Sequence, residues 1–212
     1  MIISACRILR IFFLTLKNFI EIKFSREYAA LIFDCDGTLA DSMPVHYRSW
    51  VKTLGAYGHD FSEQQFYALG GVPTEEIVHI LNFERGTHLD AVRVARQKDQ
   101  LFHDMEGEVR PRTSVVAVVK KYHRIKPMAV GSGSTRWSVE KSIAQLGLTG
   151  CFDALVCRED VEKPKPDPEV FLRGAEIMRV QPGQCIVFED TELGTQAARS
   201  AGMDVLDVRG YA

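Results

Sequence analysis

The sequence predicts a doubly wound α/β fold: a Rossmann-like parallel sheet with helices on both faces and a helical cap inserted after the first strand. First, short apolar runs alternate with helical stretches from residue 113 onward, which is typical of a parallel sheet with crossover helices. Second, about 70 residues between the first apolar run and residue 113 carry helical signals and no convincing strand. A helical insert therefore leaves the sheet after its first strand and returns before the second.

Strands are predicted where a short apolar run is bounded by loop residues, because this pattern is typical of buried strands. The first run is 29–33, which ends in an acid-rich loop. Two more runs of this kind are 128–130 and 186–188, and weaker ones are 154–156 and 205–208. These runs are the candidate strands of the sheet.

Helices of the core are predicted between these strands, over 113–122, 135–146, 168–178 and 192–201. Gly147 and Gly202 follow two of them, as glycine often does where a helix ends. Asp167 before Pro168 predicts the N-cap and first turn of the third.

The insert has helical stretches at 45–55, 63–69, 74–81 and 89–105, and the last keeps one face apolar. We therefore assign residues 25–42 and 113–212 to the α/β core and residues 43–112 to the cap.

Residues 1–24 stand apart from this pattern. They are mostly apolar, but Arg7, Arg10, Lys17 and Lys23 interrupt them, and the clean apolar run is shorter than that of a signal peptide. A membrane-surface helix with basic residues, a weak export signal, and an extension without catalytic consequence are the alternatives. We favour the last and treat the segment as an N-terminal extension of unclear role.

The composition excludes several classes of protein. Hydrophobic residues make up 46% and charged residues 25% of the 212 residues, which excludes a disordered or low-complexity chain. The formal charge of −2 gives no basic field for nucleic acid, and no apolar run reaches the roughly 18 residues of a spanning helix. The five cysteines are scattered and never spaced C-x-x-C, which argues against a zinc site or a disulfide framework. We expect a cytoplasmic monomer or weak dimer, with no nucleic-acid partner and no stable membrane association.

Four polar clusters lie where predicted strands end, the edge at which parallel sheets bind ligands. They are 34–38 (Asp-Cys-Asp-Gly-Thr), 131–134 (Gly-Ser-Gly-Ser), 163–167 (Lys-Pro-Lys-Pro-Asp) and 189–190 (Glu-Asp). Side chains alternate in extended backbone, so Asp34 and Asp36 should point the same way and Cys35 the other. Two carboxylates this close stay ionised together only near a cation, and oxygen ligands favour Mg²⁺.

The other clusters complete a site for phosphoryl transfer. Asp190 adds a carboxylate from a different strand. Ser132 and its neighbouring backbone amides precede a helix, which predicts a phosphate-binding turn. A lysine of the third cluster would offset the carboxylates and bind a phosphoryl oxygen. Carboxylate, Mg²⁺, phosphate-binding turn and lysine together indicate phosphoryl transfer.

The order D-x-D-G-T, G-S-G-S, K-P-x-P-D and F-E-D within residues 28–209 closely resembles the haloacid dehalogenase superfamily of aspartate-nucleophile phosphotransferases. The insert after the first strand is similar to that of its β-phosphoglucomutase-like branch. The resemblance implies a Mg²⁺-dependent phosphatase of small phosphorylated metabolites, above all sugar phosphates such as fructose 1-phosphate, acting through an aspartyl-phosphate. Its partner would be that small-molecule substrate.

The resemblance also implies roles for individual residues. Asp34 is the nucleophile and a metal ligand, and Asp36 is the general acid and base, with its backbone carbonyl on the metal. Ser132 is the phosphate-binding hydroxyl. For the motif lysine, Lys163 and Lys165 are alternatives, and the pattern K-P-x-P-D favours Lys163.

Further metal and substrate contacts are implied in the same way. Asp190 is the third metal ligand, and Glu189 beside it is either a ligand or a structural residue. The implied substrate contacts are Thr38, His46, Lys98 and Gly133. His46 matches a histidine at the cap base and Lys98 a substrate-contacting cap lysine, although an ordinary solvated position also accounts for each.

Two departures from the mutase pattern favour hydrolysis over a sugar phosphate mutase. A mutase binds a second phosphate with a cap arginine and a nearby lysine, but here Thr74 stands in place of the arginine and Gly70 in place of the lysine. Thr38 stands where the mutase has valine. A phospho-receiver signalling module is a further alternative, but receivers are shorter, lack the insert and place the accepting aspartate on the third strand.

Overall fold

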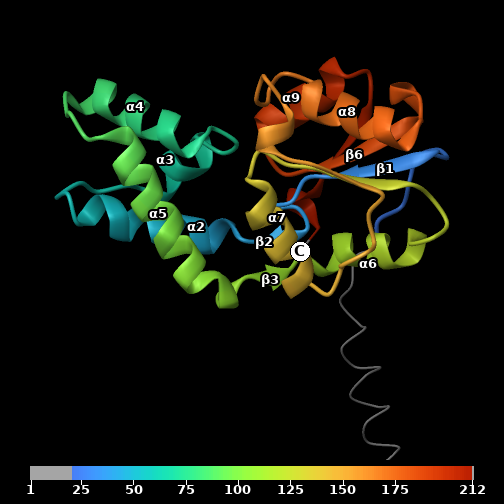
Figure 1. Ribbon diagram of the computed structural model, residues 1–212, viewed down its shortest axis with the longest axis horizontal. Helices are drawn as coiled ribbons and strands as arrows, with labels where there is room; N and C mark the ends of the chain where they lie inside the picture. The colour runs from blue at the N-terminus through green and yellow to red at the C-terminus, as the bar shows by residue number, and fades with distance from the viewer. Residues whose placement is uncertain (1–20, 212) are drawn as a thin grey trace, which may run out of the picture.

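The computed structural model describes residues 21–211, which form an α/β core and a group of helices beside it (Figure 1). The core sheet has five parallel strands in the order β5-β4-β1-β6-β7. Their bounds are β1 Ala30–Phe33, β4 Met128–Gly131, β5 Ala154–Val156, β6 Cys185–Glu189 and β7 Asp204–Asp207. Phe33 of β1 pairs with Val130 on one side and Phe188 on the other. The first strand is therefore central, and its carboxyl end meets those of β4 and β6.

Helices cover both faces of this sheet, so every residue of β1 is buried. Leu31 and Phe33 pack in one apolar cluster with α6 (Thr113–Tyr122) and α7 (Arg136–Gln145). Ala30 and Ile32 pack in another with α8 (Glu169–Met178) and α9 (Glu192–Ser200). Figure 1 shows the two helix pairs on opposite sides of the strands. This arrangement confirms the predicted doubly wound α/β fold.

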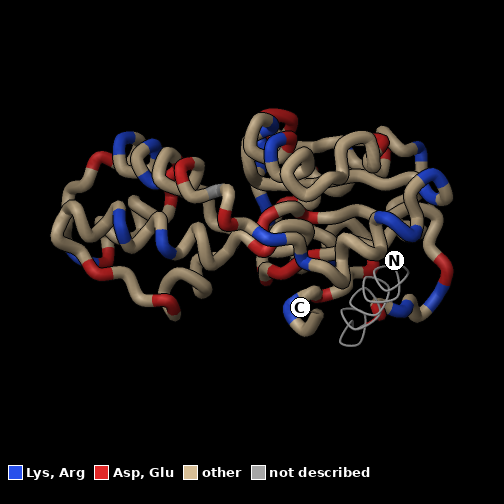
Figure 2. The backbone as a smooth tube through the Cα atoms, turned by 90° about the horizontal axis from the view of Figure 1, so that it is seen from below, with Lys and Arg blue, Asp and Glu red and all other residues tan. Residues whose placement is uncertain are grey.

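Four helices form the group that we call the cap: α2 Met43–Gly55, α3 Glu63–Ala68, α4 Thr74–Arg85 and α5 Ala91–Met105. They enclose an apolar cluster of their own that includes Trp50, Leu54 and Leu81. Burial of one such side chain contributes ~1.5–3 kcal/mol, so the cap has its own source of stability. Figure 2 shows a narrow connection between cap and core, with basic and acidic residues interspersed over both.

The chain crosses between core and cap through two short strands, β2 (Ala40–Asp41) and β3 (Arg110–Pro111), which pair antiparallel. The sequence analysis does not predict them, because two residues are too few for a periodic pattern. They bring the start and the end of the cap side by side. A single bridge between Asp36 and Ala40 places this hinge next to the loop that carries the two predicted catalytic aspartates.

Predicted and observed elements differ mainly at their ends. The helix 113–122 and the strand 154–156 have the predicted bounds, while α2 begins two residues earlier and α4 ends four residues later than predicted. The last cap helix begins at Ala91 rather than Leu89, because the Asn82 side chain binds the Leu89 amide. Pro168, not Asp167, occupies the N-cap of α8, and the Asp167 carboxylate instead accepts from the Glu169 amide.

The described end of the N-terminal segment packs against the core. Ile22 is buried, and the Phe24 ring stacks on Tyr122 at 5.5 Å and meets Phe188 edge-on at 6.0 Å. The packed core therefore begins before the predicted boundary at residue 25. The rest of the predicted extension, residues 1–20, lies outside the described residues. Within residues 21–211, no helix combines the length and the apolar character needed to cross a membrane.

Candidate active site

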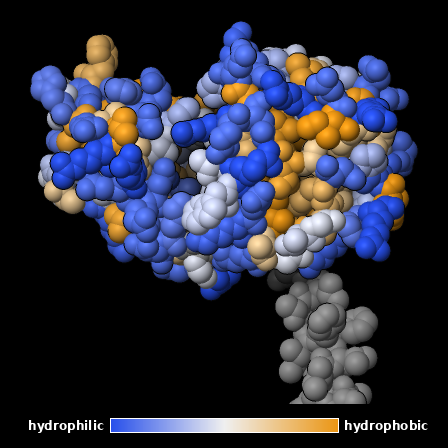
Figure 3. All heavy atoms as spheres, in the orientation of Figure 1, coloured by the Kyte–Doolittle hydropathy of each residue, from blue (hydrophilic) through white to orange (hydrophobic). Residues whose placement is uncertain are grey.

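A cavity of ≈ 220 Å³ lies between the cap and the carboxyl ends of the strands, and Figure 3 shows the surface hollowed between the two parts. The core side of its wall is polar and includes Asp34, Asp36, Ser132 and Lys165. The cap side is mainly apolar and includes Trp50, Phe66, Leu69 and Phe102. A small cavity with a few convergent polar groups is typical of a site for a small molecule.

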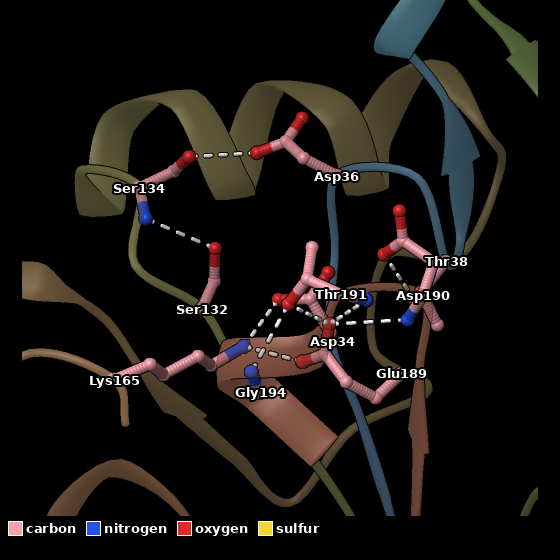
Figure 4. Close-up of polar contacts among 10 residues, drawn as sticks. All are labelled: Asp34, Asp36, Thr38, Ser132, Ser134, Lys165, Glu189, Asp190, Thr191 and Gly194. Atoms are coloured by element: carbon pink, nitrogen blue, oxygen red, sulfur yellow. Dashed lines mark hydrogen bonds and ion pairs between the residues drawn. The ribbon is translucent and has the colours of Figure 1, made fainter. Parts of the chain in front are cut away.

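Lys165 binds the predicted nucleophile directly. Its Nζ donates to Asp34 Oδ1 at 2.6 Å and to Glu189 Oε2 at 2.7 Å (Figure 4). All three residues are buried, and Glu189 is completely so. Although burial opposes the positive charge, the two carboxylates raise the pKa of Lys165 above its ordinary value. A permanent cation is therefore held against Asp34.

The geometry favours Lys165 as the motif lysine over the expected Lys163. Lys163 is exposed, is not among the described residues that line the cavity, and only its backbone amide has a partner near the site, the Glu169 carboxylate at 3.1 Å. The pattern K-P-x-P-acid occurs twice in overlapping register, from Lys163 to Asp167 and from Lys165 to Glu169. The second match is the sequence signal that could have identified Lys165.

Glu189 fixes the position of Lys165. Its Oε2 accepts from the lysine, and its Oε1 accepts from the backbone amides of Asp190 at 3.1 Å and Thr191 at 2.9 Å and from Thr191 Oγ1 at 2.8 Å. Donors thus occupy both oxygens of this carboxylate. Of the two roles that the sequence leaves open, this geometry favours the structural one over direct metal ligation.

Gly194 leaves room for the Glu189 carboxylate, since a Cβ at position 194 would lie 2.0 Å from Oε2. We expect Gly194→Ala to displace Glu189 from Lys165 and to lower the free energy of unfolding by about 3 kcal/mol, because it disrupts a buried ion pair. Urea unfolding followed by circular dichroism measures the change.

The matched control is Gly55→Ala, at a position where nothing lies within 4 Å of the added Cβ. We expect it to change stability by less than about 1 kcal/mol. A Gly194→Ala protein that is as stable as the wild type would contradict the close approach seen here.

Asp34, Glu189 and Asp190 form an acidic cluster that fits a divalent cation. One carboxylate oxygen from each lies within 4.8 Å of the others. Burial and then the Glu189 charge raise the pKa of Asp34 well above its usual range and that of Asp190 to about 7, so Lys165 alone does not offset the negative charge. Hard oxygen donors of this kind suit Mg²⁺. The Asp36 carboxylate is not in this cluster, and its expected metal contact through the backbone carbonyl stays a prediction.

Asp36 turns its carboxylate toward the phosphate-binding turn and the cap. Its Oδ2 accepts from Ser134 Oγ at 2.6 Å (Figure 4). Its Oδ1 accepts from Ser42 Oγ at 2.9 Å and lies 3.4 Å from His46 Nε2. Although burial opposes ionisation, these partners hold the pKa of Asp36 well below its usual range. As predicted, Asp34 and Asp36 both face the cavity while Cys35 packs in the apolar core.

His46 and Lys98, the two predicted cap contacts, line the cavity and bind each other. Lys98 Nζ lies 2.9 Å from His46 Nδ1 and 3.2 Å from Asp99 Oδ1. An ammonium group only donates, so Nδ1 accepts and the imidazole proton lies on Nε2, toward Asp36. Burial and then the Lys98 charge lower the pKa of His46, which keeps this imidazole neutral. Lys98 is buried, which argues against an ordinary solvated position.

The remaining predicted contacts divide into two groups. Ser132 and Gly133 line the cavity, and Ser132 Oγ accepts from the Ser134 amide at 3.1 Å. Thr38 is fully buried, is not among the described residues that line the cavity, and donates from Oγ1 to Asp190 Oδ1 at 3.0 Å. This geometry gives no support to the expected substrate contact of Thr38, because its hydroxyl binds a carboxylate of the acidic cluster.

The hydroxyl groups of Ser42, Ser134 and Thr191 bind carboxylates of the site, namely those of Asp36 and Glu189. The sequence alone gives none of these three residues a role. Ser134 belongs to the predicted phosphate-binding turn, and Thr191 follows the Glu-Asp pair at the N-cap of α9, a position that threonine favours. Both could have been found from these local signals. Ser42 could not, because its contact with Asp36 depends on the turn that leads into the hinge.

Proteins with similar sequences and folds include phosphatases and a mutase. A family model described as haloacid dehalogenase-like hydrolase matches residues 31–208. The chain is 44% identical to the fructose-1-phosphate phosphatase YqaB of Escherichia coli K12 over 182 residues, which cover 86% of this chain and 97% of that protein. It is 31% identical to a phosphorylated carbohydrates phosphatase of Thermotoga maritima, with 82% of each chain covered. A crystal structure of β-phosphoglucomutase from Clostridium difficile matches with a TM-score of 0.73 and 25% identity, covering 85% of this chain and 84% of that one.

Proposed function

The chain belongs to the haloacid dehalogenase-like hydrolases, and on that premise we propose that it is a Mg²⁺-dependent phosphatase of small phosphorylated metabolites. Sugar phosphates such as fructose 1-phosphate are the proposed substrate class, and an aspartyl-phosphate on Asp34 is the proposed intermediate. The similarity to the fructose-1-phosphate phosphatase of Escherichia coli supports the substrate class.

The observation that carries this proposal is the placement of Asp34. Its carboxylate faces the cavity between core and cap, lies 2.6 Å from the Lys165 ammonium and shares that cavity with the Ser132 hydroxyl. A carboxylate attacks phosphorus only if the negative charge of the phosphoryl group is offset. Lys165 supplies one positive charge for this purpose, and Ser132 with the turn that follows it offers donors to the phosphoryl oxygens.

The reaction has two steps. In the first, an Asp34 carboxylate oxygen forms a bond to phosphorus while the bond from phosphorus to the sugar oxygen breaks. Because its contacts in the free protein favour the ionised form, Asp36 has to take up a proton from solvent when substrate binds, and it then gives that proton to the leaving oxygen. In the second, Asp36 takes a proton from water, whose oxygen bonds to phosphorus as the bond to Asp34 breaks and phosphate is released. Ser42 and Ser134 hold Asp36 in position for both transfers.

The acidic cluster fits the Mg²⁺ that this chemistry calls for. Asp34 and Asp190 would hold the ion together with the Asp36 backbone carbonyl, and the ion would neutralise charge on the phosphoryl oxygens. Glu189, whose oxygens are both occupied by donors, would orient Lys165 next to it.

The cap favours hydrolysis over the mutase alternative. The segment 69–74 between α3 and α4 lines the cavity and contains no lysine or arginine. A mutase has to hold a second phosphate opposite the nucleophile, and this part of the wall offers it no positive charge.

The test is the initial rate of phosphate release from fructose 1-phosphate, fructose 6-phosphate, glucose 1-phosphate and glucose 6-phosphate, with Mg²⁺ and with EDTA. We expect release that depends on Mg²⁺ and that is fastest, by kcat/KM, for fructose 1-phosphate. Interconversion of sugar phosphates with a bisphosphate primer and without phosphate release would establish the mutase instead. No turnover of any of these compounds in Mg²⁺ would exclude the proposed substrate class.

A further inference from the structure

Arg112 occupies the point where the chain returns from the cap to the core. It directly follows β3 and precedes α6, so it belongs to the hinge seen between the two parts in Figure 1. Only 14% of its side chain is exposed, although the flanking residues Arg110 and Pro111 are exposed. An arginine that is mostly buried beside a hinge needs hydrogen-bond acceptors.

The Arg112 side chain binds two other segments of the chain. Nε donates to the Gly37 carbonyl at 2.7 Å, and Nη1 donates to the carbonyls of Tyr211 at 3.3 Å and Val208 at 3.4 Å. Nη2 lies 3.9 Å from Asp41 Oδ1. The shortest of these contacts holds the turn that follows the two catalytic aspartates, the Nη1 contacts hold the segment after β7, and the contact with Asp41 lies within the hinge itself.

The Gly37–Thr38 turn lies directly against Asp190. Gly37 has φ +87°, and a Cβ on it would lie 2.1 Å from Asp190 Oδ2. Thr38 Oγ1 donates to the other oxygen of the same carboxylate at 3.0 Å (Figure 4). A shift of this turn would therefore move or release Asp190, one of the proposed metal ligands.

We propose that Arg112 is a positioning residue that fixes the Gly37–Thr38 turn against Asp190 and thereby sets the affinity of the acidic cluster for Mg²⁺. A planar guanidinium can bind carbonyls of several segments at once, whereas a lysine ammonium offers a single point of charge. This inference rests on the proposed function, because it takes the cluster of Asp34 and Asp190 to be a metal site.

The test compares three variants by direct measurement of metal binding. Arg112→Met removes all side-chain donors, Arg112→Lys keeps the charge, and Arg110→Met is the matched control. Arg110 lies two residues away on the same hinge, and the hydrogen bonds that its side chain makes to described residues go to carbonyls of its own loop, Gly107 and Val109. Isothermal titration gives the Mg²⁺ dissociation constant of each protein, and thermal unfolding in EDTA shows whether each is folded.

We expect Arg112→Met to weaken Mg²⁺ binding by about tenfold or more, as the loss of groups that orient metal ligands commonly does. Arg112→Lys should lie in between, and Arg110→Met should stay within about twofold of the wild type. Phosphatase activity of Arg112→Met should then recover most of the wild-type kcat at saturating Mg²⁺, which a general loss of structure would not allow.

Three outcomes would overturn the proposal: wild-type Mg²⁺ affinity in Arg112→Met, an equal loss in Arg110→Met, or no measurable Mg²⁺ binding by the wild type. The last would also remove the metal from the proposed function, whereas the first two would leave the phosphatase proposal intact. If Arg112→Met does not fold, Arg112→Lys decides the question: weakened binding supports the proposal and wild-type affinity overturns it.

Discussion

Replacing Lys165 with methionine is expected to lower kcat/KM for a sugar phosphate by about 10³-fold. The reason is that the variant loses a preorganised positive charge that stabilises the phosphoryl group during transfer. Lys165 Nζ lies 2.6 Å from Asp34 Oδ1 inside the cavity, and both side chains are buried. The same substitution at Lys163, which is exposed and does not line the cavity, is expected to leave kcat/KM within about twofold. Initial rates of phosphate release measure both.

The two lysines form a matched pair, because both sit before a proline in the same loop. Since Lys165→Met leaves two buried carboxylates without their cation, its unfolding must be measured alongside its activity. Lys165→Arg, which keeps the charge, is the second variant if the methionine protein does not fold. Loss of activity in Lys163→Met with full activity in Lys165→Met would show that the register of this loop differs from the one described.

The ambiguity between these lysines illustrates what a sequence pattern leaves open. Both begin a K-P-x-P-acid match, and the motif alone favours Lys163, whereas the geometry favours Lys165. The three-dimensional structure separates them because the Lys165 ammonium lies 4.8 Å from the Phe171 ring and between two buried carboxylates. Phe171 lies on α8, Asp34 directly follows β1 and Glu189 ends β6. The local sequence of the loop does not specify which of its lysines reaches these residues, because that depends on the tertiary fold.

The fold itself was largely predictable from hydrophobic patterning. Buried strands such as β1 and β6 are continuous apolar runs, and the helices between them have periodic apolar faces, so their order and the parallel sheet follow from the sequence. The two hinge strands were not predictable, since each has only two residues. The direction of the Thr38 hydroxyl was not predictable for a similar reason: the motif places Thr38 beside the aspartates, but only the turn at Gly37 directs its hydroxyl to Asp190.

The two motif aspartates are expected to respond differently to the same substitution, because they hold different partners. Asp34→Asn should reduce phosphate release by at least about 10⁴-fold for every substrate, since loss of a nucleophile removes the covalent route. Asp36→Asn should lower kcat/KM for a sugar phosphate by about 10³-fold, within the usual range for a general acid. For p-nitrophenyl phosphate, whose leaving group needs no proton, the loss from Asp36→Asn should be much smaller.

This dependence on the leaving group separates the role of an acid from that of a ligand or a structural residue. Asp36 accepts from Ser42, Ser134 and His46 and its carboxylate lies outside the acidic cluster, so its replacement should leave Mg²⁺ affinity close to that of the wild type. Asp60→Asn, at an exposed position of the cap, is the matched control and should keep activity within about twofold. Equal losses for both leaving groups in Asp36→Asn would argue that this residue acts on the phosphoryl group or the metal. Turnover by Asp34→Asn above about 10⁻⁴ of the wild-type rate would argue against Asp34 as the nucleophile, because no amide side chain can form the aspartyl-phosphate.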